Sequence, residues 1–139
     1  MAKTFTWTVD TEGDCGGRTN ETKGISQGLP TIFETFRAYN VKALFFVSTE
    51  LLKDHPRLIK EILERGHEVG SHGHFHIRYR DSWRASQDAE MSNAIISSVL
   101  GHSNIHYRAP WFHRITSDPY SNPRNHMSLL KIMHLGLKP

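Results

Sequence analysis

Strand-like segments alternate with helix-like segments along most of this 139-residue chain. The predicted strands are short runs of β-branched, aromatic and aliphatic residues, and they cover residues 3–9, 41–47, 67–71 and 104–108. The predicted helices carry apolar residues at helical spacing, and they cover residues 25–39, 54–65 and 85–100. This order is typical of an α/β fold with a parallel sheet or barrel, whose functional residues gather at the carboxyl ends of the strands.

The last predicted helix, residues 85–100, is the least regular of the three. Met91, Ile95 and Val99 lie in line at helical spacing and predict its buried face. Gly101 follows the last apolar residue and is expected to end the helix. After about residue 116 the chain is rich in turn-forming residues, and residues 127–135 could form one short helix.

Composition limits the classes of protein that the chain can belong to. The formal net charge is only +3 and the basic residues are scattered, so we expect no nucleic-acid partner. Cys15 is the single cysteine, which excludes an intrachain disulfide. The sequence contains neither a signal-peptide run nor a membrane-spanning segment, so the expectation is a cytoplasmic location and no membrane partner.

Ten histidines are many for a chain of this length, and histidine is the commonest metal ligand. Three of them lie in Ser71-His72-Gly73-His74-Phe75-His76, directly after a predicted strand. His72 and His76 are four residues apart, so a helical turn would place both imidazoles on one face. A pair of surface histidines is the alternative, and His74 would point elsewhere, into a cleft or behind the ligands.

Acidic residues follow the first predicted strand at Asp10, Glu12 and Asp14. Side chains spaced by two point the same way if the strand continues, and they splay apart in a loop. The functional interpretation is a metal ligand and a general base, and the alternative is a solvated acidic loop.

The third polar segment is Tyr107-Arg108-Ala109-Pro110-Trp111-Phe112, at the end of the last predicted strand. Arg108 could pair there with a buried carboxylate, beside a turn that Pro110 restricts. The alternative is a surface arginine, with Trp111 and Phe112 in the core.

The order Asp, His-x-x-x-His, Arg-x-Pro resembles the polysaccharide deacetylase family, also called the NodB-homology group or carbohydrate esterase family 4. The matching segments are TVDTEGD, HEVGSHGHFH and YRAPWF, and the resemblance spans about residues 3–112. It implies a partial (β/α) barrel of the NodB type, with parallel strands and flanking helices. The whole chain, residues 1–139, would be a single, incomplete domain of this type.

The resemblance also implies roles for individual residues. His72 and His76 would be metal ligands, Asp10 the general base and Arg108 the arginine that orients it. Thr11 stands where the family usually has a ligand aspartate, so Glu12 becomes the expected third ligand and Asp14 the reserve. Substrate-binding positions would be Pro110, Trp111, whose backbone N–H would help to hold the oxyanion, and His74.

The implied reaction is metal-dependent removal of an N-acetyl, or O-acetyl, group from a polysaccharide or amino sugar. Zinc is the expected cofactor, and cobalt, nickel or manganese suit the same donors. The partner would be an N-acetylated glycan, and a homo-oligomer could cover the open edge of the sheet.

Two departures leave alternatives open. Family members are longer, and nothing after Phe112 matches their later motifs, which hold the general acid; His113, His126 and His134 are the available histidines. The chain could therefore be a truncated or disrupted gene product, a catalytically weak remnant that binds metal or glycan. An allantoinase-like amidase acting on another C–N bond is the further alternative.

Overall fold

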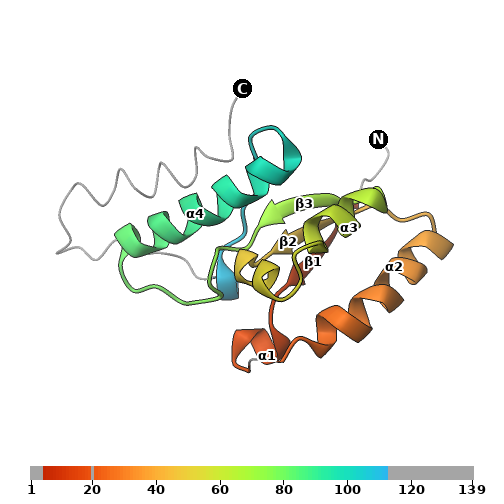
Figure 1. Ribbon diagram of the computed structural model, residues 1–139, viewed down its shortest axis with the longest axis horizontal. Coiled ribbons are helices and arrows are strands. Elements are labelled where there is room, and N and C mark those ends of the chain that lie inside the picture. The colour runs from red at the N-terminus through yellow and green to blue at the C-terminus, as the bar shows by residue number, and fades with distance from the viewer. Residues whose placement is uncertain (1–4, 20, 113–139) are drawn as a thin grey trace.

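Three parallel strands form the centre of the molecule (Figure 1). The structure, a computed structural model, describes residues 5–19 and 21–112. The strands lie in the order β1 (Trp7–Thr11), β2 (Ala43–Val47) and β3 (Glu68–Ser71). β1 begins later than the sequence predicted and includes Asp10 and Thr11. The α/β class and the parallel sheet with flanking helices are confirmed.

The helices follow the strands in the predicted alternation. A short helix, α1 (Asp14–Gly17), interrupts the predicted polar loop after β1. One turn of π-helix leads into α2, and a 3-10 helix, here called η2, precedes α3. The bounds are Gly24–Gly28 for the π-helix, Leu29–Ala38 for α2, Thr49–Lys53 for η2, Leu58–Glu64 for α3 and Ser82–Leu100 for α4.

One face of the sheet carries the hydrophobic core. The strand register aligns Val9 with Phe45 and Phe45 with Val69, so these side chains project from the same face. Helices α2, α3 and α4 contribute side chains to the same core cluster, among them Phe33, Ile59 and Ile96. Figure 1 shows α3 in front of the sheet, with α2 on one side and α4 on the other. All three helices therefore cover one face, as in a barrel wall.

The other face of the sheet carries polar residues of β1. Asp10 aligns with Phe46 and Phe46 with Gly70, and the guanidinium of Arg108 lies 4.2 Å from the Phe46 ring centre. A side chain at position 70 would collide with His106, since its Cβ would lie 2.8 Å from His106 Cβ, and it would press on the Phe46 ring at 3.0 Å. The site therefore develops on the face opposite to the helices.

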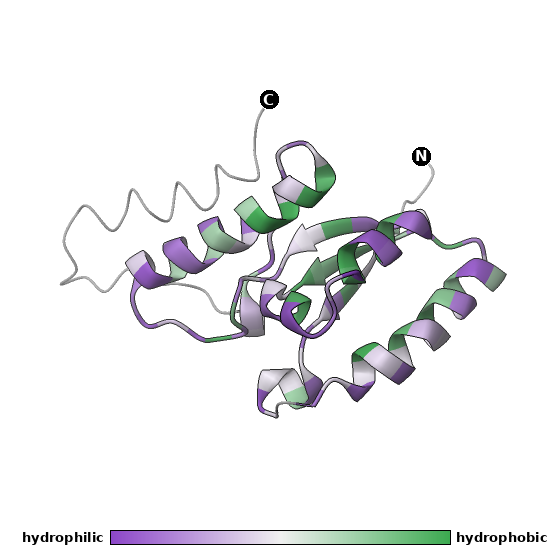
Figure 2. Ribbon diagram, in the orientation of Figure 1, coloured by the Kyte–Doolittle hydropathy of each residue, from purple (hydrophilic) through white to green (hydrophobic). Residues whose placement is uncertain are grey.

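The buried face of α4 differs from the prediction. Met91 is 51% exposed, whereas Ala89, Ser92 and Ile96 are buried. The prediction followed the large apolar residues, but this helix packs its N-terminal half through small and polar residues. Figure 2 shows that half as mostly hydrophilic and the C-terminal end as hydrophobic. Gly101 ends the helix in the left-handed region, as expected.

The fourth predicted strand is reduced to one bridge. Tyr107 pairs with Ser71 in parallel, since Ser71 N–H donates to the His106 carbonyl and Arg108 N–H donates to the Ser71 carbonyl. This contact is enough to bring Arg108 beside the carboxyl end of β3. Residues 113–139, including His113, His126 and His134, lie outside the described residues. In the described part of the chain, no helix is both long and apolar enough to cross a membrane.

Candidate metal centre

Glu12, His72 and His76 converge at the carboxyl ends of β1 and β3. One ligand atom from each of the three lies within 4.8 Å of the other two. Glu12 Oε2 lies 3.1 Å from His72 Nε2 and 2.5 Å from His76 Nε2. The structure thus brings together the three side chains that the sequence interpretation named as ligands.

The two histidines do not converge through a helical turn, as their spacing suggested. Residues 72–76 form an irregular loop, and the ring centres of His72 and His76 lie 5.1 Å apart. His72 N–H donates to the Val47 carbonyl, which extends the pairing with β2 by one residue before the chain turns. His72 and His76 are thus spaced as on one face of a helix, but the backbone between them is not helical. The shape of the loop therefore depends on contacts with the rest of the fold.

Backbone carbonyls determine which nitrogen each imidazole presents. His72 Nδ1 lies 2.9 Å from the Arg108 carbonyl oxygen, and His76 Nδ1 lies 2.7 Å from the Gly16 carbonyl oxygen. A carbonyl can only accept, so both Nδ1 atoms carry a hydrogen, and in the neutral form of each imidazole Nε2 is then the acceptor. Two acceptor nitrogens and one carboxylate oxygen then face each other.

Three converging acceptors repel one another unless a positive charge lies among them, either a proton or a metal ion. Burial lowers the pKa of His72, although the Arg108 carbonyl and the carboxylates of Asp10 and Glu12 oppose that shift. A neutral imidazole is the form that ligates a metal. The donor set of two histidines and one carboxylate, with carbonyls behind both rings, therefore suits a divalent ion such as zinc.

Asp10 lies beside the cluster. Its Oδ1 accepts a 2.6 Å hydrogen bond from Arg108 Nη1, and its Oδ2 lies 3.9 Å from His72 Nε2. Arg108 Nη2 also donates to Thr8 Oγ1 at 3.0 Å. Thr8 and Asp10 share one face of β1, and Glu12 continues in the same direction just beyond it. The alternative of carboxylates that splay apart does not hold for this pair.

Asp14, the reserve ligand, is used elsewhere. Its two carboxylate oxygens accept from the backbone N–H groups of Lys23 and Gly24, at 3.0 and 2.9 Å. It therefore closes the loop after β1 and lies outside the cluster. Thr11, at the position where the family usually has a ligand, is buried on the face of β1 opposite to Asp10.

Trp111 lies against the cluster on its outer side. Its ring centre is 5.1 Å from that of His76, and the Arg18 guanidinium lies 5.0 Å from the Trp111 ring centre. A Cβ at Gly16 would lie 2.8 Å from this indole, so the α1 turn can approach only because glycine is there. The alternative that placed Trp111 in the core is wrong, since the residue is 38% exposed. Pro110 precedes it, in a short 3-10 turn.

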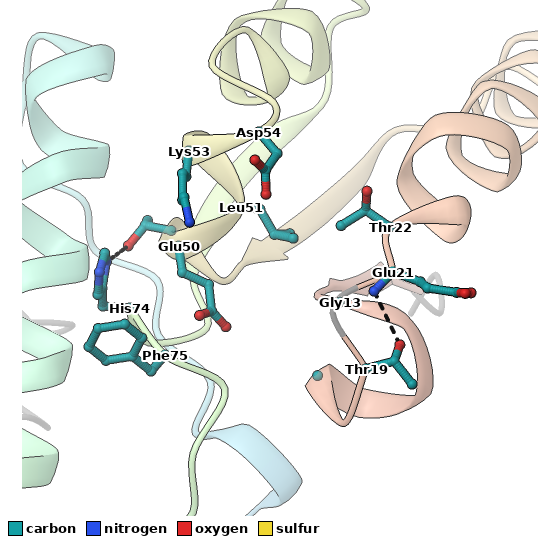
Figure 3. A pocket seen from close by; sticks show the side chains of 12 residues that line it. Gly13, Thr19, Glu21, Thr22, Glu50, Leu51, Lys53, Asp54, His74 and Phe75 are labelled. Atoms are coloured by element: carbon teal, nitrogen blue, oxygen red, sulfur yellow. Dashed lines mark hydrogen bonds between the residues drawn. The ribbon is translucent and has the colours of Figure 1, made fainter.

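His74 points away from the cluster, as expected, and lines a separate cavity of about 540 Å³. Its Nδ1 lies 2.9 Å from Thr49 Oγ1 (Figure 3). The cavity is polar, and its lining includes Glu50, Lys53, Asp54, Thr22 and Phe75. It adjoins the cluster because Glu50 Oε1 accepts from His76 N–H at 3.4 Å and Gly17, another lining residue, packs on the His76 ring.

Comparison with known proteins identifies the family. The sequence model of the polysaccharide deacetylase family matches residues 8–116. The chain belongs to the polysaccharide deacetylase family. A peptidoglycan deacetylase of Helicobacter pylori is 29% identical over 96 residues, which is 66% of this chain and 32% of that protein. The chain thus spans about a third of the length of this curated relative.

Solved structures show the same fold. A family 4 carbohydrate esterase from Streptomyces lividans, in complex with acetate, superimposes with a TM-score of 0.64 at 15% identity, over 92% of this chain and 58% of that one. A carbohydrate esterase family 4 pseudoenzyme from Bacillus anthracis gives a TM-score of 0.65 at 18% identity, over 92% of this chain and 41% of that one. The same fold therefore occurs both in an esterase and in a pseudoenzyme.

Proposed function

We propose that this chain is a metal-dependent deacetylase domain that removes acetyl groups from an N-acetylated glycan. The observation that carries the proposal is the convergence of Glu12 Oε2 with the Nε2 atoms of His72 and His76 beside Asp10. One curated relative, the Helicobacter pylori protein that matches over 96 residues, is a peptidoglycan deacetylase, so N-acetylated sugars of the cell wall are the first substrates to test.

Glu12, His72 and His76 would hold the ion. Zinc is the first candidate, with cobalt, nickel or manganese as alternatives, because ligand type alone does not select among them. A divalent ion there would polarise the acetyl carbonyl and lower the pKa of an attacking water. Three protein donors would leave open positions for substrate and water, which is the composition of a catalytic zinc site rather than a structural one.

Asp10 is the general base in this proposal. Its Oδ2 lies 3.9 Å from His72 Nε2, on the side of the carboxylate that Arg108 leaves open. Arg108 donates to Oδ1 and so orients the carboxylate, which leaves Oδ2 to take a proton from water. General-base catalysis of this kind contributes roughly 10²–10⁴-fold to the rate.

The residues around Trp111 would bind the acetyl group and the sugar. The Trp111 backbone N–H would donate to the oxyanion, and the exposed part of its indole offers an apolar surface to a sugar ring. His74, Glu50 and the hydroxyls of the adjoining cavity would hold a neighbouring sugar unit (Figure 3).

Acetate release from N-acetylglucosamine oligomers, measured with the full chain and added zinc or cobalt, tests the proposal. We expect Asp10→Asn to lower the rate by about 10²–10⁴-fold while metal binding persists. Asp14→Asn serves as a matched control, because Asp14 lies outside the cluster, and it is expected to keep the activity. Full metal occupancy without acetate release from any N-acetylated glycan would instead support a binding role.

A further inference from the structure

The loop that carries the two histidines rests on a buried carboxylate from another element. Asp88 lies in the first half of α4 and is 7% exposed. Among the described residues it is the one aspartate or glutamate in the buried class. A buried carboxylate costs free energy unless hydrogen bonds satisfy it. The hydrogen-bond donors around Asp88 therefore indicate which part of the fold this carboxylate stabilises.

Asp88 receives hydrogen bonds from two successive amides between the histidines. His74 N–H donates to Oδ2 at 2.8 Å and Phe75 N–H donates to Oδ1 at 2.9 Å. The Tyr79 hydroxyl, just beyond the loop, also donates to Oδ1 at 3.0 Å. The negative charge of Asp88 contributes, together with burial, to a raised pKa of Tyr107, about 12. Three hydrogen-bond donors from the loop and from Tyr79 thus surround the carboxylate.

The other side of the loop is held by η2. Thr49 N–H donates to the Gly73 carbonyl at 3.1 Å, and Glu50 N–H donates to the His74 carbonyl at 3.0 Å. The carbonyls of the loop therefore pair with η2, and the amides of His74 and Phe75 pair with Asp88. No regular secondary structure stabilises this segment, so these two sets of contacts replace it.

Gly73 shows how closely the carboxylate approaches the loop. Its φ is +83°, a conformation that favours glycine, and a Cβ there would lie 2.6 Å from Asp88 Oδ2. Any side chain at position 73 would displace the carboxylate or the loop. The glycine of the SHGHFH segment is thus needed for contact with α4.

We propose that Asp88 is a positioning residue, which sets the separation of His72 and His76 by holding the two amides between them. Asp88 contacts neither histidine ring and acts through the backbone. The hydrogen bonds between Asp88 and the loop exist without a metal ion. The inference rests on the proposed function only where it predicts an effect of Asp88 on metal affinity.

The first test is amide hydrogen exchange of the metal-free full chain, read by NMR. The amides of His74 and Phe75 are expected to exchange slowly in the wild type, although they lie in a loop without regular structure. In Asp88→Asn at least one of the two should exchange faster, because the carboxamide offers one acceptor oxygen where the carboxylate offers two. Exchange at the rate of an open loop in the wild type would overturn the proposal.

The second test is metal affinity, measured by competition between the full chain and a chromophoric chelator for zinc. Asp88→Asn is expected to weaken binding by about 10- to 100-fold, the usual effect of removing support behind a ligand. Ile96→Val is the control, since it removes one methylene from the same helix at a buried position remote from the loop. It should lower the melting temperature without changing the affinity for zinc.

Equal zinc affinities for the wild type and Asp88→Asn would overturn the proposal. If Asp88→Asn does not fold, Tyr79→Phe removes one donor to Oδ1 and should still accelerate exchange at Phe75. Unchanged exchange in that variant would also count against the proposal. If the wild type binds no metal, the proposed function fails, but hydrogen exchange still tests whether Asp88 holds the amides of His74 and Phe75.

Discussion

Arg108 Nη1 lies 2.6 Å from Asp10 Oδ1 and joins two residues that are 98 positions apart in the sequence. The same arginine supports His72 through its backbone carbonyl, at 2.9 Å from Nδ1. One residue thus orients the proposed base with its side chain and a proposed ligand with its main chain. The two contributions can be separated by mutation.

Replacing the side chain of Arg108 is expected to reduce turnover and spare metal binding. Arg108→Met keeps the carbonyl that supports His72 but loses the hydrogen bonds to Asp10 and Thr8. Losing a hydrogen bond to a charged group costs about 1.5–3 kcal/mol, or ~10- to 160-fold in acetate-release rate if the bond is needed in the transition state. Zinc affinity should change far less, and Arg57→Met, at an exposed ion pair with Glu64, is the control. A parallel loss of zinc affinity and turnover would contradict the separation.

Zinc is expected to stabilise the protein only when Glu12 is present. Zinc at 100 times its dissociation constant should stabilise the wild type by about 2.7 kcal/mol, seen as a higher melting temperature. Glu12→Ala should abolish most of this shift, whereas Asp14→Asn should keep it, since Asp14 is bonded to Lys23 and Gly24 instead. The reverse pattern would make Asp14 the third ligand.

Gly17 and Gly28 should respond oppositely to alanine. Gly17 has a φ of +71°, and a Cβ there would lie 3.2 Å from His76 Cβ, whereas nothing lies within 4 Å of a Cβ at Gly28. Gly17→Ala is expected to cost about 1–2 kcal/mol and to weaken zinc binding by displacing His76. Gly28→Ala should stabilise the fold by about 0.5–1 kcal/mol, measured by urea unfolding. Unchanged zinc affinity in Gly17→Ala would show that the α1 turn does not support His76.

His74 is expected to affect the binding of longer substrates. His74→Ala removes the contact with Thr49 and one polar group of the adjoining cavity. One hydrogen bond is worth about 0.5–1.5 kcal/mol, so KM for oligomers should rise about 2- to 13-fold. The KM for a single N-acetylated sugar, which does not reach the cavity, should change less. An equal rise for both substrates would place His74 at the reacting sugar.

The metal-free protein should lose stability when the pH falls below neutrality, in part because of His67. This histidine is buried among Phe33, Phe36 and Phe45, and burial together with the charges of Lys42 and Arg65 lowers its pKa. The unfolded chain then binds the proton more readily, so the contribution of His67 is complete above its unfolded pKa, near 6.5, and is lost as the pH falls.

Urea unfolding between pH 7.5 and 5.5 checks this dependence. The decrease in the free energy of unfolding should be smaller in His67→Phe, which keeps the stacking and cannot titrate. His72, whose pKa is also lowered, remains in both proteins and accounts for a common part of the decrease. Identical pH profiles of the two proteins would contradict a role for His67.

Local patterns were sufficient to predict the sheet and most of the helices. The apolar run of β2 and the helical spacing of α2 and α3 depend on near neighbours, and the structure confirms them within a few residues. The buried face of α4 could not be predicted from near neighbours. It includes Asp88 and Ser92, polar residues whose hydrogen-bond partners are distant in the sequence. Residues 104–108 form only a bridge, because a strand needs a continuous partner and β3 ends at Ser71.

The site was predictable where chemistry depends on residue type and unpredictable where it depends on the backbone. Glu12, His72 and His76 could be named from their order and spacing. The role of the Gly16 carbonyl could not be predicted from the sequence. Its contact with His76 depends on a turn with positive φ at Cys15, Gly16 and Gly17. Thr8 could have been found, since it shares the face of Asp10 in a predicted strand.

Within the described residues, β1 hydrogen-bonds to β2 along one side only. The backbone groups of its outer side flank Thr8 and Asp10, so whatever chain segment pairs there would form a wall of the site within one strand spacing, about 5 Å, of the proposed base. That segment would limit how a glycan chain can approach the ion. Sugar preference could therefore differ between two proteins that share the arrangement of Glu12, His72 and His76, if different segments pair with the outer side of β1.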